Sequence, residues 1–498
     1  AAPSAGLDVV STTPSPDFGP RRTPQRRLDA LATDGGEKSG LAPYRLPVPD
    51  DFRRPMAAAW LLLAVAALLV SGLFVILIVF SRTPGLQALF PFEGFFHLGI
   101  VAHVDFSVLI WFAAIGAMLW TLAARPRARA VAWTAFALVT AGSLLMAYGP
   151  FQPGQAIMSN YVPVLDNVPF LAGLAVFAAG IVLMALRGLL FALPVGSAMA
   201  PGGVLRFGIH TSVLCMLLAA LALVWSLVSL PGWMQGKPFF ETLFWGSGHV
   251  LQFAWTQLML VAWLWLAGVT AWRVPLSPRL VTLLLLAGAL PAFLTIWAYL
   301  VFDVGSPQHR TFFIWMMAAG GGLAAGPIGL ALLTGWWQSA RATDTSTRGL
   351  RAALMFSILL FGIGGVLGFM IDNSNTMVPA HYHGCIVAVT LAFMGVALHL
   401  LPEFGFARPS PKLVLAMPWV YGVGQILHVA GLAFAGGHGV QRKTAGAAQG
   451  LEGIAQLASM AVMGIGGLVA IIGGILFLVA VAGSLRRRRV AAVSQPAL

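Results

Sequence analysis

Residues 376–402 read TMVPAHYHGCIVAVTLAFMGVALHLLP, an apolar segment that carries two histidines near its start. The segment is long enough to cross a bilayer, which takes about 20 apolar residues in a helix. The chain has twelve segments of this kind, at 56–80, 92–123, 129–150, 166–187, 206–230, 239–272, 278–302, 309–338, 350–371, 376–402, 412–436 and 453–485. The sequence therefore predicts an all-α, polytopic membrane protein built as a twelve-transmembrane-helix bundle.

The composition supports a membrane protein and argues against a nucleic-acid partner. Hydrophobic residues make up 59% of the chain and charged residues only 9%, whereas soluble domains carry roughly 25% charged residues. The net charge is +13, but the basic residues lie between the apolar segments and in the tails, where membrane topology accounts for them. We expect contact with membrane lipid and none with nucleic acid.

The chain divides into three expected parts. Residues 1–55 are polar, Pro-rich and basic without an apolar run, which predicts a mobile cytoplasmic tail and not a secretory signal. Residues 56–485 form the membrane domain, without an internal repeat. Residues 486–498 begin with four arginines and are expected to form a basic cytoplasmic tail.

Lysine and arginine positions set the expected orientation. With the N-terminus inside, the inner loops hold Arg125, Arg127, Arg129, Arg187, Arg206, Arg273, Arg279, Arg341, Arg348, Arg351, Arg408 and Lys412. The outer loops hold Arg82, Lys237, Arg310, Arg442 and Lys443. Positive residues concentrate on the cytoplasmic side of membrane proteins, so both termini are expected in the cytoplasm of a bacterium, with the bundle in its inner membrane.

Five histidines from four spans fall at a similar depth in the outer half of this bundle: His103, His249, His309, His381 and His383. Ionisable groups inside a membrane are costly and usually mark a functional site. A single intramembrane histidine is more often a hydrogen-bonded packing residue. Five at one depth favour a cofactor site.

The pair His381 and His383 has a specific geometry. Residues two apart on a helix point about 200° away from each other, so these two imidazoles face opposite sides of their span and cannot bind one metal ion. They can each bind one of two planar cofactors on opposite faces. A haem iron takes an axial imidazole, so the pair fits two haems.

At these motifs the sequence resembles the large subunit of the haem-copper oxidase superfamily, which includes cytochrome oxidases and nitric oxide reductases. The matching stretches are VPAHYHG at 378–384, FWGSGH at 244–249, the pair Ala102-His103, and GVQRK at 439–443. The resemblance covers roughly residues 56–485 and implies a haem-binding membrane domain of the subunit I type.

The resemblance also implies a role for each matching residue. His103 and His383 would bind a six-coordinate low-spin haem, and His381 would be the proximal ligand of a high-spin haem. Arg442 and Lys443 would pair with haem propionates, which suits cationic donors. A solvated loop is the simpler interpretation of these two residues.

His249 stands where the superfamily's oxidases have a ligand of the second metal, but its neighbours differ. Four residues on, the oxidases carry a tyrosine bonded to that histidine, and this chain has Phe253. Two residues on, proton-pumping oxidases carry a glutamate, and this chain has Leu251. The adjacent His-His pair expected near the outer end of the next span aligns with Tyr299-Leu300.

The nearest replacement ligands are Asp303 and His309. With His249 they would make a ligand set of two imidazoles and a carboxylate, which favours non-haem iron over copper. Retention of copper on fewer ligands is the second interpretation, and loss of the second metal is the third. An interfacial charge beside Arg310 is the simpler interpretation of Asp303 and His309.

The remaining histidines, His97, His210, His399, His428 and His438, are expected to be structural. His428 is the one that could do more, because it precedes the Arg442-Lys443 loop. Asp105, two residues after His103, is an unusual acid for a membrane span.

The function expected from these features is that of a respiratory oxidoreductase that reduces a diatomic gas. His249 and His381 would carry catalysis. The missing tyrosine and His-His pair favour NO over O2. The alternatives are a cytochrome c or quinol oxidase, and a non-catalytic electron carrier or gas sensor without the second metal. The chain contains no cytochrome c or copper domain of its own, so we expect a cytochrome c or cupredoxin-type partner subunit to donate electrons.

Overall fold

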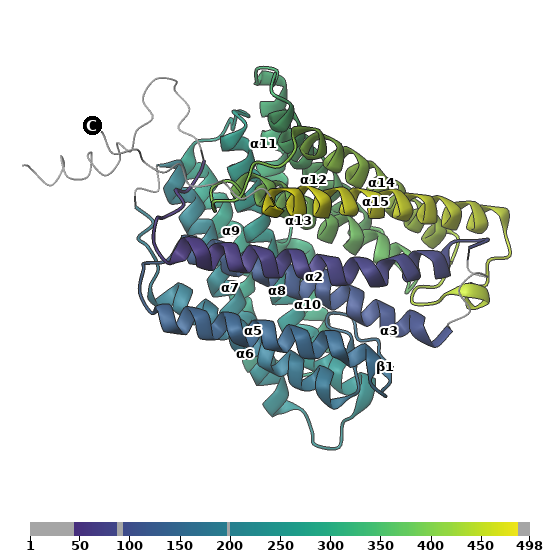
Figure 1. Ribbon diagram of the computed structural model, residues 1–498. Coiled ribbons are helices and arrows are strands. Elements are labelled where there is room, and N and C mark those ends of the chain that lie inside the picture. The colour runs from purple at the N-terminus through teal and green to yellow at the C-terminus, as the bar shows by residue number, and fades with distance from the viewer. Residues whose placement is uncertain (1–43, 87–92, 197–199, 487–498) are drawn as a thin grey trace, which may run out of the picture. The chain divides into compact units, whose positions relative to one another are not determined.

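The computed structural model describes residues 44–86, 93–196 and 200–486 (Figure 1). They belong to a compact unit that begins at Pro43. The tail expected at 1–55 lies outside the described residues up to residue 43, and so does the basic tail after Arg486. Tyr44 and Leu46, at the end of the first tail, are buried, and the first described helix already begins at Arg53.

Most of the described chain is helical. The elements in chain order are α2 (Arg53–Arg82), α3 (Glu93–Val104), the π-helix η2 (Asp105–Ile110), α4 (Trp111–Leu122), α5 (Arg129–Tyr148), the 3-10 turn η3 (Gly149–Phe151), β1 (Ala156–Ile157), β2 (Val164–Leu165), α6 (Val168–Leu190), α7 (Pro201–Ser229), α8 (Gly236–Val269), α9 (Pro278–Val301), α10 (Pro307–Gly320), α11 (Ala325–Gln338), α12 (Thr345–Phe369), α13 (Met377–Leu400), α14 (Pro411–Gly437), η4 (Gly446–Gln449) and α15 (Ile454–Arg486). The strands β1 and β2 form one short antiparallel hairpin.

Twelve stretches of the described chain are long and apolar enough to cross a membrane. Each one overlaps one of the twelve segments expected from the sequence. The second comprises α3, η2 and α4, and the eighth comprises α10 and α11. The predicted all-α bundle of twelve spans is confirmed.

Polar and proline residues begin several spans where the sequence switches from loop to apolar run. The side chains of Asn167, Ser277, Ser306 and Asp344 each accept a hydrogen bond from a backbone N–H in the first turn of α6, α9, α10 and α12. Proline follows within two residues of the first three of these caps. Both features satisfy or remove the free N–H groups at a helix start.

Small residues allow the spans to pack closely. A Cβ atom on Gly384 of α13 would lie 2.6 Å from the Gly364 Cα of α12, and α14 approaches α15 in the same way at Gly424. Small residues are typical of helix contacts in membranes, because they let backbones come together. In Figure 1, α14 and α15 accordingly run side by side.

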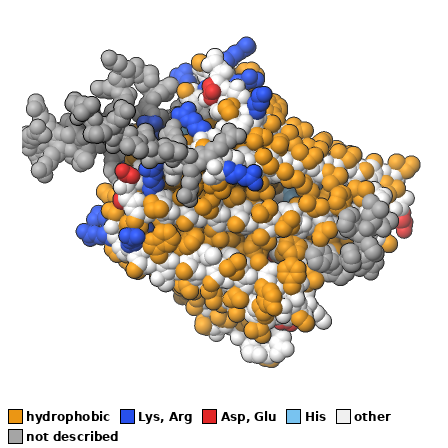
Figure 2. All heavy atoms as spheres, viewed as in Figure 1, with side chains coloured by type: hydrophobic (Ala, Val, Ile, Leu, Met, Phe, Trp, Pro, Cys, Tyr) orange, Lys and Arg blue, Asp and Glu red, His pale blue; other side chains and the backbone are white. Residues whose placement is uncertain are grey.

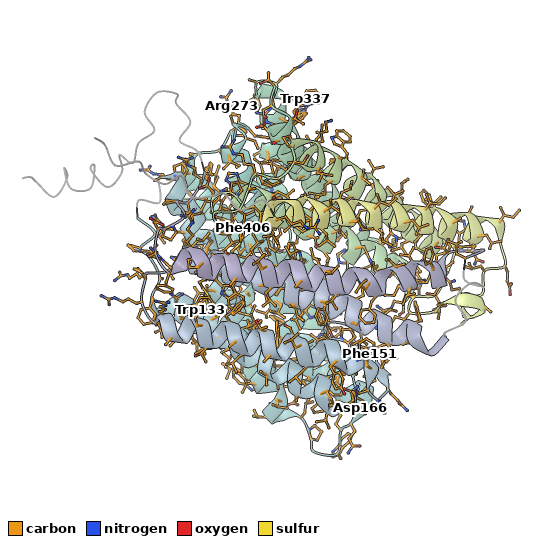
Figure 3. The ribbon with its side chains drawn as sticks, viewed as in Figure 1. Trp133, Phe151, Asp166, Arg273, Trp337 and Phe406 are labelled. Carbon is orange, nitrogen blue, oxygen red and sulfur yellow. The ribbon has the colours of Figure 1, made fainter. Side chains whose placement is uncertain are left out.

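The outward faces of the spans are apolar. Figure 2 shows hydrophobic side chains over most of the visible surface, with Lys and Arg gathered toward one end of the helices. Leu73 is 61% exposed and Trp337 is 85% exposed, and Figure 3 shows Trp337, Trp133 and Phe151 among the outer side chains. An apolar surface of this extent would be an aggregation hazard in water, and lipid is its natural environment.

Buried arginines stabilise the loops at the basic end of the helices. Arg351 donates to the backbone oxygens of Thr270, Ala271 and Ala340, and so joins α12 to the end of α8. Arg53 forms an ion pair of 2.7 Å with Asp51 and donates to the Ala124 oxygen. Burial of a charged group is costly unless it is paired or hydrogen-bonded, so these bonds fix the loops that they reach.

Candidate functional site

The two histidines of α13 are held in a defined tautomer. His381 Nδ1 lies 2.8 Å from the Gly364 carbonyl oxygen on α12, and His383 Nδ1 lies 2.8 Å from the Pro379 oxygen in the preceding turn. A carbonyl oxygen only accepts, so Nδ1 must carry the ring proton in both imidazoles. Each Nε2 therefore has a free lone pair. Gly368 leaves room for this arrangement, since a Cβ there would lie 2.7 Å from His381 Nδ1.

His103 of α3 is held in the same way by α2. The Ser71 hydroxyl donates to the His103 backbone oxygen at 3.1 Å, so its oxygen accepts the His103 Nδ1–H at 2.8 Å. Within the described chain, Nε2 of His103, His381 and His383 has no hydrogen-bond partner. Metal-binding histidines usually donate their other ring N–H to an oxygen in this manner, so the three imidazoles fit axial ligation of haem iron.

The surroundings of the three imidazoles also fit a large cofactor. All three side chains remain partly exposed although they lie within membrane-spanning helices. His103 lies within electrostatic range of His383 and of His428 on α14. The ring centroids of His383 and His428 are 5.0 Å apart, and His428 Nδ1 donates to the Met463 oxygen at 2.9 Å. His428 thus joins this group, as its position before the Arg442-Lys443 loop allowed.

Asp105 follows His103 at the start of the π-helix η2. Its side chain is 1% exposed, and neither carboxylate oxygen has a hydrogen-bond partner among the described residues. Short π-helical insertions often occur at functional sites. The wide turn separates this acid from the regular helix that carries His103.

His249 of α8 lies in a different environment. Its Nδ1 donates to the Trp245 oxygen at 2.7 Å, and its Nε2 lies 2.8 Å from the Tyr161 hydroxyl. Burial raises the pKa of the Tyr161 phenol, and the nearby Glu241 carboxylate raises it further, against a hydrogen bond from Gln252. The phenol is therefore protonated and donates to His249 Nε2.

Tyr161 is the site residue that the sequence did not reveal. It lies between β1 and β2, in the connection from α5 to α6, and it is 88 residues from His249. A tyrosine in a polar loop carries no pattern that points to a buried imidazole.

His309 of α10 is fully buried, and both of its ring nitrogens lack a hydrogen-bond partner among the described residues. Its ring contacts Tyr299 at 4.9 Å and Phe313 at 5.0 Å between centroids. The His249 ring lies 5.6 Å from the same Phe313 ring. A buried polar group without a partner is uncommon in folded proteins, so His309 is a candidate ligand of a metal or of another bound group.

Asp303 is not part of this group. It is exposed, in the turn between α9 and α10. Within residues 44–86, 93–196 and 200–486, no three His, Cys, Asp or Glu side chains lie close enough together to hold one metal ion. The structure brings the rings of His249 and His309 into contact with the same Phe313 ring, whereas Asp303 is exposed.

Arg442 and Lys443 lie in the loop between α14 and α15 and bind the β1–β2 hairpin. Arg442 donates to Ser374 Oγ at 3.0 Å and to Asn160 Oδ1 at 3.2 Å. Lys443 donates to the Met158 oxygen at 2.8 Å and to the same Asn160 oxygen at 3.3 Å. Burial lowers the pKa of Lys443 to about 8, and the Arg442 charge contributes to this shift.

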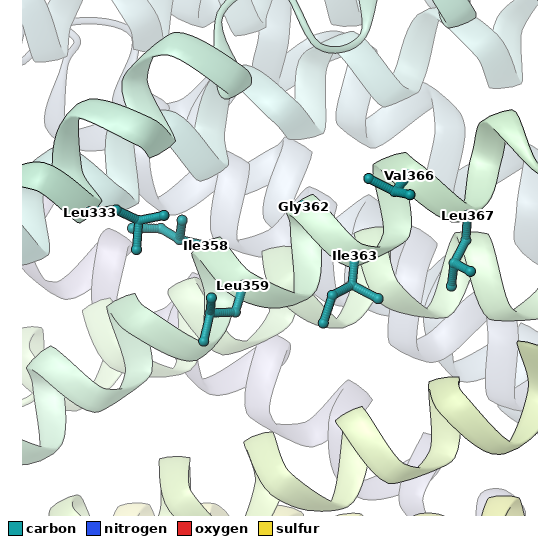
Figure 4. Close-up of a pocket in the computed structure, with 7 residues that line it drawn as sticks. All are labelled: Leu333, Ile358, Leu359, Gly362, Ile363, Val366 and Leu367. Atoms are coloured by element: carbon teal, nitrogen blue, oxygen red, sulfur yellow. The ribbon is translucent and has the colours of Figure 1, made fainter.

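A groove of about 410 Å³ lies on the surface between α11 and α12 (Figure 4). It is lined by Leu333 of α11 and by apolar residues of α12 between Ile358 and Leu367. It contains no side chain that could bind a metal ion or exchange a proton.

The arrangement of twelve spans with buried histidines defines the class of fold, and comparison with known proteins agrees. A haem-copper terminal oxidase, solved by cryo-EM as a dimer, superposes with a TM-score of 0.66 over 88% of this chain and 84% of its own, at 15% sequence identity. The chain therefore has the fold of a haem-copper oxidase subunit I, as the sequence motifs implied.

Two uncharacterized proteins are similar in sequence. One from Rickettsia prowazekii is 27% identical over 488 residues, which cover 85% of this chain and 94% of its own. One from Aquifex aeolicus is 28% identical over 363 residues, which cover 72% of this chain and 88% of its own. No protein-family model matches the chain.

Proposed function

We propose that this chain is the catalytic subunit of a membrane respiratory oxidoreductase that reduces a diatomic gas on two haems. The observation that carries the proposal is the common state of His103, His381 and His383. Each keeps a free Nε2 because its Nδ1 proton is donated to an oxygen. That state suits haem iron, and the three imidazoles lie in a fold that resembles a haem-copper terminal oxidase.

In this proposal His103 and His383 would hold a low-spin haem, and His381, on the other face of α13, would hold a high-spin haem. When bound, the haems supply electron transfer and a site for the gas. The protein fixes the imidazole planes through Ser71, Gly364 and Pro379. Arg442 and Lys443 would neutralise propionates at the outer end, exchanging part of their bonds to the hairpin for these anions.

The distal side of the gas site would be formed by His249 and His309. Both imidazoles contact the Phe313 ring, and they would be the two histidine ligands of a second metal, with iron or copper as the candidates. We favour NO as the substrate, because Phe253 provides no hydroxyl on α8 and the His-His pair is replaced at Tyr299-Leu300. Reduction of O2 is the second candidate, and the Tyr161 phenol on His249 favours it.

We further propose an inner-membrane location with both termini in the cytoplasm, supported by the basic residues at one end of the helices (Figure 2). Electrons would come from a cytochrome c or cupredoxin-type partner subunit at the outer face. The partner subunit would bind near Arg442 and Lys443, which lie at the proposed outer end of the haem region.

The experiment is to purify the protein, extract and identify its haems, count its non-haem iron and copper, and measure consumption of NO and O2. Two haems, a CO-binding reduced form and NO turnover are expected. Turnover of O2 with NO inert would select the second candidate. Two haems without turnover of either gas would leave an electron carrier or a gas sensor.

A further inference from the structure

The nitrogen of His249 that could bind a ligand is already occupied by a residue from a distant part of the chain. His249 Nδ1 carries the ring proton, because it faces the Trp245 carbonyl oxygen at 2.7 Å. Only Nε2 is left as an acceptor. The Tyr161 hydroxyl lies 2.8 Å from it, so both ring nitrogens are engaged and the imidazole has one orientation.

The Tyr161 ring packs against α8 at Gly248. A Cβ atom on Gly248 would lie 2.2 Å from the Tyr161 Cγ, so the absence of a side chain at this position is what admits the ring. The Tyr161 ring also contacts the Trp245 ring at 5.8 Å and the His249 ring at 4.6 Å between centroids. The tyrosine is thus fitted against one turn of α8.

The hairpin that carries Tyr161 is anchored at the neighbouring residue. The Asn160 backbone N–H donates to the Glu241 carboxylate at 3.1 Å, and its side-chain amide also donates to Glu241. The Asn160 oxygen accepts from Arg442 and Lys443. Three charged side chains from two elements therefore fix the hairpin directly beside Tyr161, which is more than a solvated loop requires.

We propose that Tyr161 is a positioning residue of the gas site: its hydroxyl holds the His249 imidazole by Nε2, in place of the hydroxyl that α8 lacks at Phe253. The inference rests on the function proposed above. A second metal would need the same Nε2 lone pair, so the phenol would release this nitrogen to the metal and stay beside the imidazole, packed against Gly248. The hairpin is then a structural part of the site.

The test compares Tyr161→Phe with the wild type and with Tyr148→Phe, in the full-length, haem-loaded protein. Tyr148 is 53% exposed at the end of α5, so its variant removes a phenol hydroxyl that does not touch His249. Tyr161→Phe should lower the maximal rate of gas turnover by roughly tenfold or more, since misplacement of a site group by about 1 Å can cost about a hundredfold. The KM for the gas should change little.

A spectroscopic readout separates a site effect from a loss of fold. The infrared band of CO on the reduced high-spin haem should shift or split in Tyr161→Phe and stay unchanged in Tyr148→Phe, because distal polarity and hydrogen-bond donors act on the bound gas. The low-spin haem spectrum should be the same in all three proteins. If Tyr161→Phe matches Tyr148→Phe in both band and turnover, the inference is overturned.

A second measurement does not depend on haem chemistry. Gly248→Ala should lower the melting temperature when Tyr161 is present and cost much less in a Tyr161→Ala background, because the added Cβ meets the tyrosine ring and contacting residues are energetically coupled. Equal losses in both backgrounds would overturn the inference. The wild type could show this coupling and yet bind no CO and consume no gas. In that case the proposed function is wrong, whereas the packing of Tyr161 against Gly248 of α8 is supported.

Discussion

The α13 side and the α8 side of the candidate site differ in how their histidines are held. On the α13 side, His381, His383 and the facing His103 each donate Nδ1–H to an oxygen and keep Nε2 free. On the α8 side, His249 Nε2 accepts from Tyr161, and neither ring nitrogen of His309 has a partner among the described residues. The three imidazoles of the first side can therefore act as axial ligands, whereas on the second side Tyr161 occupies the free nitrogen of His249.

This difference shows that the two sides are built by different means. The α13 side depends on local geometry: two residues on one helix, each bonded to a carbonyl in the same or the adjacent span. The α8 side depends on a hairpin and a helix start brought together from residues 161, 249 and 309. The predictions below test the two sides separately.

The largest effect is expected for His381→Ala. Loss of the proposed proximal ligand should abolish CO binding and gas turnover, while the low-spin signal should survive because His383 points to the other face of α13. Optical difference spectra with CO measure both properties. His438→Ala is a suitable control, since His438 is exposed at the end of α14. Retained CO binding in His381→Ala would assign the gas site to another residue.

Replacement of His103 should remove the low-spin haem signature while a CO-binding haem remains. Either His103→Ala or His383→Ala leaves that iron with one imidazole, and EPR and optical spectra report the change. His428 contacts His383 at 5.0 Å and is the competing ligand. A low-spin spectrum that survives in His103→Ala and disappears in His428→Ala would contradict the assignment.

On the α8 side, His309→Ala and Asp303→Ala should behave differently. If one non-haem metal is bound per two haems, His309→Ala should remove it, because both buried ring nitrogens of His309 lack another partner among the described residues. Turnover should fall by at least the roughly ten- to hundredfold that loss of an outer-shell partner costs. Asp303→Ala should retain the metal, because Asp303 is exposed. Metal analysis of both variants distinguishes the two residues. Loss of the metal in Asp303→Ala would support the ligand set of two histidines and an aspartate.

The smallest effect concerns pH and Lys443. Burial in the folded protein holds the pKa of Lys443 at about 8, below its ordinary value of 10.5. Between these values the unfolded chain binds a proton that the folded chain does not, so the free energy of unfolding should rise with pH. Lys443→Met should lack this rise. Melting curves at several pH values in detergent measure it, and parallel profiles for the two proteins would show that Lys443 is not responsible.

Much of the fold was predictable from local patterns. Twelve apolar runs can only be helices in a bilayer, because every backbone polar group must be satisfied within the segment. The runs at 56–80 and 453–485, for example, became α2 and α15 with changes only at their ends. The depth of His103 and His381 follows from counting turns from the span ends. Their contacts with Ser71 and Gly364 do not, since these partners lie on other helices.

Helical periodicity and hydropathy depend on neighbours within a few residues. They determine the twelve spans, the apolar exterior and the opposed faces of His381 and His383. The contact of His249 with Tyr161, in contrast, joins residues 88 positions apart. Such contacts are set by how whole spans pack, through positions such as Gly248 that admit a ring. No local pattern encodes them, and so the tyrosine that closes the α8 side became visible only in the folded chain.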